Sequence, residues 1–195
     1  TLTPRCEGEA LAGVEQSLTV QTLSGPHEGL VYCENFESAA IPTGWTASGT
    51  ASTSNGASHS GNRSLYLNAS ATNHAALPVI ALDNGATVDI NTLMLNMYVY
   101  AVSANGRLEI CVADYPEESS ELMAIDTVEP ALSGIWAPVT LSLAGYAGEM
   151  RYVVLRAIGG AVFVDDMRVG RCLMSGVALT ERTATSVTLE WDTPL

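Results

Sequence analysis

The sequence contains no lysine, so its eight cationic side chains are all arginine. This absence excludes Schiff-base chemistry and lysine nucleophiles. Twenty-one acidic residues give a net charge of −13, which leaves too few cations for a basic patch that could hold nucleic acid or an anionic membrane surface. We therefore expect no nucleic-acid partner and no membrane insertion.

Long hydrophobic runs are also missing. Thr92–Val102 is strongly apolar, but Asn96 interrupts it and it is much shorter than the roughly 20 residues of a membrane-spanning helix. No charged segment followed by an apolar core opens the chain, so an exported protein would already have lost its signal peptide. The 195 residues fit one large β-domain with attached fragments, or two small domains.

Cysteine is scarce, and its spacing forms no motif. The four cysteines make no CxxC pair and no Cys/His cluster at zinc spacing, which argues against a zinc site. In an oxidising compartment three two-bridge pairings are possible, and the spacing does not choose between them. Cys111 lies in an apolar strand pattern, where a buried free thiol and a bridge remain alternatives.

Helical periodicity is nearly absent, whereas short segments of period-two alternation recur between Gly, Asn, Ser and Pro clusters. This pattern predicts an all-β fold with two packed antiparallel sheets. The predicted strands are Gly29–Phe36, Ser64–Asn68, Ala75–Leu82, Thr87–Val102, Arg107–Ala113, Leu122–Val128, Ile135–Leu143, Arg151–Ala157, Ala161–Val169, Gly176–Thr180 and Ser186–Trp191.

The Asn105-Gly106 pair is the strongest turn signal in the chain. It predicts a type I′ hairpin, which would make the strands Thr87–Val102 and Arg107–Ala113 neighbours in one sheet. Two other segments predict exposed loops at the rim: Ala47–Asn62, which is rich in Ser, Gly, Ala and Thr, and the acidic segment Asp114–Glu121.

Thr87–Val102 presents two different faces. One face is uniformly apolar, with Leu93, Leu95, Met97 and Val99, and is predicted to be core. The other face is either a solvated surface or a platform for a ligand, since tyrosine offers an apolar ring with a polar tip. Its candidate ligand-binding residues are Asn96, Tyr98 and Tyr100, to which Tyr115 of the acidic loop is added as the tyrosine most exposed to solvent.

Catalytic motifs are missing. The histidines lie in linker or loop contexts, with neither a Gly-x-Ser-x-Gly elbow nor a His-Glu-x-x-His pair. The adjacent Glu117 and Glu118 are interpreted as solvated loop residues and not as an acid/base pair. We expect the chain not to be an enzyme.

Three motifs follow one another along the chain. They are Glu34-Asn-Phe-Glu-Ser with Pro42-x-Gly-Trp45, Ser58-His-Ser-Gly-Asn-Arg-Ser-Leu65, and Val162-Phe-Val-Asp-Asp-Met-Arg-Val169 ahead of Cys172. Together they resemble the MAM-like and cleaved-adhesin jelly-roll domains of Bacteroidetes surface proteins. The resemblance covers about residues 30–172 and implies a jelly-roll β-sandwich over 29–173, secreted or displayed on the cell surface. Residues 1–28 would be a linker or an edge strand.

The resemblance also implies a structural calcium ion that ties the first strand to the last. Glu37 would supply the first carboxylate, Asn35 and Asn62 carbonyl oxygens, and Asp165 the late ligand, with Asp166 as the alternative if a bulge shifts the register. Asp165 would point inward with Met167. The competing interpretation is that Glu37 and Asp165 accept main-chain or arginine hydrogen bonds without a metal. His59 stands where some relatives have an acidic ligand, which weakens the case for calcium.

Ser175–Trp191 resembles the first two strands of a fibronectin type III domain, so 174–195 would be the truncated start of a second module. Cys33 and Cys172 flank the first and last strands of the sandwich, which makes a bridge between them a hypothesis. We expect a non-catalytic extracellular module that binds a glycan or a host protein beside neighbouring domains of its own chain. The alternative is a passive spacer. Trp45 and Trp136 lie in motifs in which we expect burial.

Overall fold

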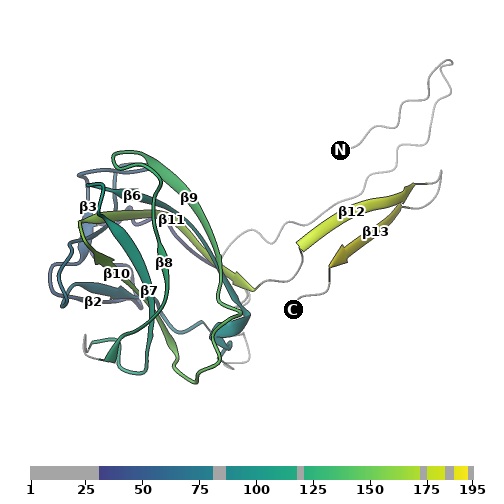
Figure 1. The fold of residues 1–195 in the computed structure, drawn as a ribbon, viewed down its shortest axis with the longest axis horizontal. Helices are drawn as coiled ribbons and strands as arrows, with labels where there is room; N and C mark the ends of the chain where they lie inside the picture. The colour runs from purple at the N-terminus through teal and green to yellow at the C-terminus, as the bar shows by residue number, and fades with distance from the viewer. Residues whose placement is uncertain (1–30, 81–86, 118–120, 172–174, 183–186, 193–195) are drawn as a thin grey trace, which may run out of the picture.

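The computed structural model describes residues 31–80, 87–117, 121–171, 175–182 and 187–192, and it contains almost only strands (Figure 1). No helix among these residues is long and apolar enough to cross a membrane. The elements are β1 (Val31–Glu34), β2 (Thr46–Ser48), β3 (Ser52–Ser54), β4 (Ser64–Leu67), β5 (His74–Ala76), the 3₁₀ turn η1 (Ile90–Thr92), β6 (Leu93–Ala101), β7 (Arg107–Ala113), β8 (Met123–Val128), β9 (Trp136–Ser142), β10 (Tyr152–Ile158), β11 (Val162–Arg171), β12 (Ser175–Arg182) and β13 (Val187–Asp192).

Two antiparallel sheets form a jelly-roll sandwich, which confirms the predicted fold class. The six-stranded sheet has the order β3-β4-β11-β6-β9, and β1 pairs with the remaining length of β11. The five-stranded sheet has the order β2-β5-β10-β7-β8. The first strand of the sandwich therefore lies against its last one, with Val31 opposite Gly170.

The core lies between the inner faces of the two sheets. Alternate residues of β6 point into it, and Leu95 and Val99 are fully buried, as the alternation predicts. They pack with Leu108 and Ile110 of β7 and with Val164 of β11 in one apolar cluster. The other face of β6 points outward and is half-buried.

The predicted hairpin at Asn105-Gly106 is wrong. β6 pairs with β11 and β9, whereas β7 pairs with β10 and β8, so the turn joins the two sheets. Neither Asn105 nor Gly106 has the positive φ of a type I′ turn. Instead the Gly106 N–H donates to the Ser103 carbonyl oxygen at 2.9 Å.

Three other predicted boundaries are also corrected. The expected loop Ala47–Asn62 contains the short strands β2 and β3, which hydrophobic alternation cannot reveal because each has only three residues. β5 is His74–Ala76, so it begins one residue before the predicted strand Ala75–Leu82 and ends at Ala76. β6 begins at Leu93, after a 3₁₀ turn, and not at Thr87.

The predicted pair of strands near the C-terminus is present as a separate antiparallel hairpin of β12 and β13. Its assignment to a fibronectin type III domain stays a prediction, and residues 1–28 lie outside the described residues. Cys33 is exposed on β1 opposite Arg168, while Cys172 also lies outside the described residues, so the bridge between them stays a prediction.

Cys111 is a free thiol, fully buried in β7. Burial is the main cause that raises its pKa to about 11. Of the two alternatives for this cysteine, the structure therefore shows the buried thiol.

Two turns meet at one end of the sandwich and require glycine. Gly159 has a φ of +68°, and a Cβ there would lie 2.2 Å from the Asn105 carbonyl oxygen. We expect Gly159→Ala to lower the free energy of unfolding by about 1–3 kcal/mol, because it combines a left-handed backbone with a clash against a carbonyl group. Urea unfolding measures this change. Gly145→Ala, where no atom lies within 4 Å of the new Cβ, is the matched control and should be nearly neutral.

Candidate functional site

Four aromatic side chains form a line across the outer face of the six-stranded sheet. Strand register places Phe163 of β11 opposite Tyr66 of β4 and Tyr100 of β6, and places Tyr100 opposite Trp136 of β9. Facing residues in antiparallel strands share a face of the sheet, so the four rings follow one another across four strands. We call Tyr66, Phe163, Tyr100 and Trp136 the aromatic strip.

The rings of the strip contact one another at an angle. The centroid distances are 5.0 Å for Tyr66–Phe163, 6.0 Å for Phe163–Tyr100 and 5.4 Å for Tyr100–Trp136, with interplanar angles of 48°, 77° and 50°. Tilted and edge-to-face contacts of this kind are favourable and hold rings in place. Phe163 is only 7% exposed, whereas the other three rings are half-buried. The strip is thus a pre-formed apolar surface with polar tips.

Tyr98 lies beside the strip on the outer face of β6 but is covered by another ring. The His59 imidazole stacks on it with centroids 3.5 Å apart and planes 12° from parallel. His59 also meets the Trp136 ring edge-on at 5.9 Å. The candidate residue Tyr98 therefore supports His59, and a ligand approaching from outside meets the imidazole first.

The loop 59–63, which carries His59, is held by two carboxylates far apart in the sequence, one just after β1 and one in β11. Glu37 accepts the Asn62 and Arg63 N–H groups at 3.0 Å. Asp165 Oδ2 accepts the N–H groups of His59 and Ser60 at 2.7 and 3.2 Å. These bonds satisfy main-chain donors and at the same time fix the position of the imidazole.

Asp166 completes this arrangement. Its Oδ1 accepts the Ser60 hydroxyl at 2.7 Å, and its Oδ2 lies 2.6 Å from His59 Nδ1. Its backbone has a φ of +47°, a left-handed conformation that only one other non-glycine residue of the described chain, Phe36, adopts. The cause is a bulge in β11, where the register to β6 shifts between Asp165 and Arg168.

The bulge corrects the orientation predicted for Asp165. Regular alternation would have turned it inward with Met167, but the register places it opposite Tyr98, on the outer face. It is nevertheless fully buried, because loop 59–63 covers it. Burial is the main cause that raises its pKa above 3.8, while the three main-chain N–H groups that it accepts act in the opposite direction.

The five predicted calcium ligands lie around this loop. Asn35 accepts the Glu37 N–H at 3.3 Å, and Glu37, Asn62, Asp165 and Asp166 are joined as described. Their oxygens suit calcium by type, but the arrangement does not fit, because N–H groups point at the carboxylate oxygens that a cation would need. No three His, Cys, Asp or Glu side chains gather into a metal-holding group in the described part of the chain. Calcium binding stays a prediction, and it would require the loop to turn carbonyl groups inward.

The other two candidate ligand residues lie apart from each other. Asn96 is half-buried on the outer face of β6, where its Oδ1 accepts the Thr140 hydroxyl at 2.8 Å. Tyr115 is 63% exposed, as expected, but it follows β7 of the other sheet. The candidate site therefore contains Asn96, Tyr98 and Tyr100 and excludes Tyr115.

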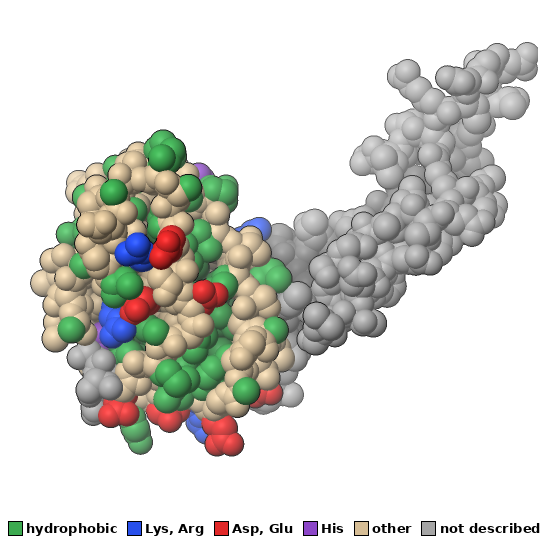
Figure 2. Space-filling model, viewed as in Figure 1, with side chains coloured by type: hydrophobic (Ala, Val, Ile, Leu, Met, Phe, Trp, Pro, Cys, Tyr) green, Lys and Arg blue, Asp and Glu red, His purple; other side chains and the backbone are tan. Residues whose placement is uncertain are grey.

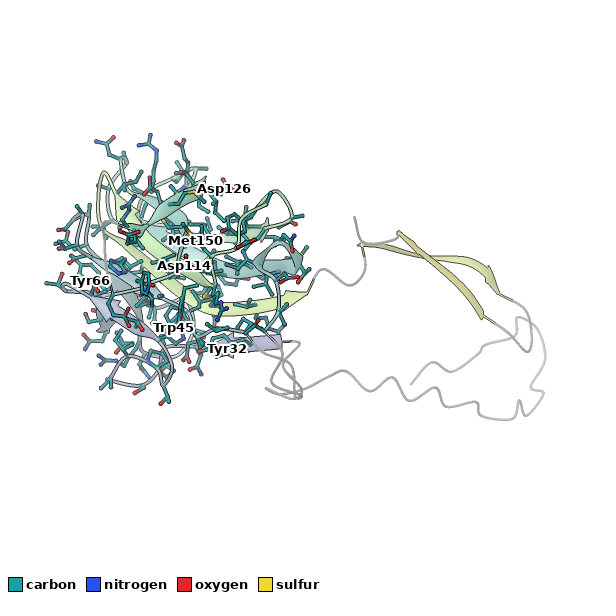
Figure 3. The ribbon with its side chains drawn as sticks, turned by 90° about the horizontal axis from the view of Figure 1, so that it is seen from below. Tyr32, Trp45, Tyr66, Asp114, Asp126 and Met150 are labelled. Carbon is teal, nitrogen blue, oxygen red and sulfur yellow. The ribbon has the colours of Figure 1, made fainter. Side chains whose placement is uncertain are left out.

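Several residues of the site were not predicted. Trp136 was expected to be buried like Trp45, which is 8% exposed and donates its indole N–H to the Tyr32 hydroxyl (Figure 3). Trp136 is instead half-buried on the outer face. Tyr66, labelled in Figure 3, and Phe163 alternate with core leucine and valine residues in their strands, and this period-two signal could have placed both on the outer face.

Part of the outer face of the five-stranded sheet is covered by the chain itself. Ala76, Cys111, Ala113 and Val154 are fully buried there. The segment after β7 crosses this face: His74 Nε2–H donates to the Pro116 carbonyl oxygen at 2.6 Å, and Ser48 Oγ donates to the Glu117 carbonyl oxygen at 3.3 Å.

Acidic side chains and a surface hollow lie in other parts of the described chain. Acidic side chains gather along the lower edge of the view in Figure 2, and the upper end is apolar or uncharged. A hollow of about 370 Å³ lies between β8 and residues 142–148, and the ionisable side chains of its lining are Asp126 and Tyr146 alone. No pair of carboxylates faces across it, as acid/base catalysis of glycoside hydrolysis would need.

Comparisons with known proteins bear on the fold. No protein-family model and no curated protein matches the chain. The K1 cleaved adhesin domain of Lys-gingipain from Porphyromonas gingivalis superposes with a TM-score of 0.51 at 17% identity, over 72% of this chain and 98% of that domain. The K2 domain of the same protein gives 0.52 at 11% identity, over 71% and 98%. A xylan-binding domain from Paenibacillus barcinonensis gives 0.48 at 19% identity, over 72% and 92%.

The two adhesin domains share the jelly-roll fold with this chain, which confirms the cleaved-adhesin resemblance at the level of fold. At identities this low, a shared fold does not imply a shared ligand or partner. The xylan-binding domain, with a TM-score below 0.5, is too distant for any conclusion. The MAM-like assignment stays a prediction.

Thermal unfolding tests the calcium prediction. If calcium binds at loop 59–63, the melting temperature rises when calcium replaces excess EDTA, because a ligand of the folded state alone stabilises that state. Glu37→Gln should abolish the rise. An unchanged melting temperature would contradict calcium binding at loop 59–63.

Asp165 should give stability a characteristic pH dependence in EDTA. Its folded-state pKa is raised, so the folded state holds a proton that the unfolded state has already released. The stability of the wild type should therefore fall, relative to Asp165→Asn, as the pH rises from about 3.8 through the raised pKa. Urea unfolding across this pH range measures the difference, and a difference that grows in the opposite direction would show a lowered pKa.

Proposed function

We propose that this chain is a non-catalytic binding module that recognises a glycan through the aromatic strip. The observation that carries the proposal is the line of Tyr66, Phe163, Tyr100 and Trp136 on the outer face of a sheet. Three of these rings are half-exposed and not buried in the core.

Ring chemistry supports a sugar ligand. An aromatic face attracts the apolar C–H face of a sugar ring, and the tyrosine hydroxyl and the indole N–H offer hydrogen bonds at the rim. Tyr100 and Trp136 face each other on adjacent strands, and Tyr66 lies beyond the buried Phe163, so the strip offers half-exposed rings to successive residues of a chain-like ligand. The rings brace one another, so little conformational entropy is lost on binding.

The surroundings support an uncharged ligand. No ionisable residue occurs in 102–106, 130–135 or 159–161, the segments that follow β6 and precede β9 and β11, the strands of Tyr100, Trp136 and Phe163. The net charge of −13 opposes the approach of anions. A glycan is also the kind of partner that an extracellular module meets, and we propose that the chain works outside the cell.

A protein ligand is the second candidate. Val102, Leu132 and Ile135 are 52%, 63% and 56% exposed at the end of the strip, where the Gly134 N–H donates to the Ala101 carbonyl oxygen at 2.9 Å. Exposed aliphatic side chains close together are typical of protein interfaces. A passive spacer, the third possibility, would need neither these side chains nor the strip.

Glycan binding to the purified protein tests the proposal, with Trp136→Ala as the main variant. Removing this half-exposed ring should weaken binding at least about tenfold, since aromatic contacts dominate such sites. Affinity electrophoresis in neutral polysaccharides and a glycan array measure it. Tyr115→Ala, which removes an exposed ring away from the strip, is the control and should bind like the wild type.

The outcomes separate the three candidates. Binding that survives Trp136→Ala would contradict a site at the strip. An absence of glycan binding, together with capture of a protein that Leu132→Asp abolishes, would favour the second candidate. If the protein binds neither a glycan nor another protein, the passive spacer is the remaining candidate.

A further inference from the structure

The rings of His59 and Trp136 form a corner at the β9 end of the strip. The corner presents hydrogen-bonding groups that have no partner in the described chain. The two rings meet nearly perpendicularly, at an interplanar angle of 70°. The His59 side chain is 31% exposed, and Tyr98 supports its inner face. Its outer face and one ring nitrogen are thus left for a ligand.

Asp166 determines which nitrogen that is. A carboxylate only accepts hydrogen bonds, so at the 2.6 Å contact His59 Nδ1 must carry the proton. In the neutral imidazole Nε2 then has a lone pair and accepts. Among the described residues His59 Nε2 has no hydrogen-bond partner, and neither has the Trp136 indole N–H, which only donates. The corner therefore offers one acceptor and one donor.

The backbone of Asp166 shows that this arrangement has a cost. A non-glycine residue with a φ of +47° is strained, and such strain persists only where the surroundings enforce it. Here the bulge in β11 turns Asp166 towards loop 59–63, where it binds both the Ser60 hydroxyl and the imidazole. A loop held only for stability would not need its one imidazole oriented by a strained residue, because Glu37 and Asp165 already hold the backbone.

We infer that the corner of His59 and Trp136 is a subsite that recognises hydroxyl groups of a neutral sugar, with Asp166 as the positioning residue that fixes the His59 tautomer. This subsite rests on the proposed glycan-binding function, and it supplies the polar contacts between the protein and the sugar. The strip supplies stacking, which reads the C–H face of a sugar ring and makes no hydrogen bond to its hydroxyl groups. The acceptor and donor of the corner add direct recognition of hydroxyl position.

Tautomer state is the first test, and it needs no glycan. Nitrogen-15 NMR of the protein at mildly alkaline pH should show His59 protonated on Nδ1. Asp166→Asn should reduce this preference, since an amide can accept or donate, while asparagine keeps the left-handed backbone. Asp126→Asn, which removes an exposed carboxylate on β8, is the matched control and should leave the His59 signals unchanged. A wild-type ring protonated on Nε2 would overturn the inference.

Binding of paired neutral oligosaccharides that differ at a single hydroxyl group is the second test. His59→Phe keeps a ring on Tyr98 but removes Nε2, so we expect about a tenfold loss of affinity for the preferred sugar and little preference between the two. Asp166→Asn should lose part of the preference with the ring still in place. Equal melting temperatures of the variants and the wild type check that the loop stays folded.

The results distinguish this inference from the proposed function. If the wild type binds glycans and Trp136→Ala abolishes binding, but His59→Phe binds with unchanged affinity and preference, then the strip is the site and the hydroxyl subsite is refuted. If the wild type binds no glycan, the proposed function fails and the subsite fails with it.

Discussion

Hydrogen bonds from loop 59–63 to three carboxylates are the constraint on which the arrangement of the outer face depends. Asp165 and Asp166 are adjacent in sequence, yet the bulge lets one lie under the loop and the other bind its side chains. Glu37, from the opposite end of the chain, holds the loop at its other side. A buried carboxylate is costly unless donors surround it, and the loop supplies them from its own backbone. These hydrogen bonds fix the position of the loop. They thereby also place His59 on the Tyr98 ring and beside Trp136 at the end of the strip.

The fold class and most strands could be predicted because period-two alternation directly reports burial on one face. β6 shows this best, since Leu93, Leu95, Met97 and Val99 all lie in the core as expected. Pairing could not be predicted in the same way. Asn105-Gly106 suggested a hairpin, but the core takes β6 and β7 from opposite sheets, and the turn packs against Gly159 instead. Burying the apolar faces of β6 and β7 against each other, in opposite sheets, thus outweighed the local preference of Asn105-Gly106 for a hairpin turn.

About half of the candidate site followed from the sequence. The outer face of β6 is visible as alternation, which gave Asn96, Tyr98 and Tyr100. The rest depends on which strands lie beside β6, and no local pattern states that β11 and β9 bring Phe163 and Trp136 to its two sides. His59 was noted only as a departure from a metal-binding pattern. Its stacking role depends on a bulge over 100 residues away, because Asp166 reaches it across the fold.

The pairing of β1 with β11 has a mechanical consequence. The strands are antiparallel, and Val31 lies opposite Gly170, so the chain enters and leaves the sandwich at the same end of one pair. A pulling force applied through the flanking segments would load the four residue pairs one after another, as in opening a zipper, and not all at once in shear. β1 would therefore peel away at low force, from Val31 towards Glu34. The next contact under tension would be Glu37, so traction on the chain would reach the loop beneath His59 before it reached the core.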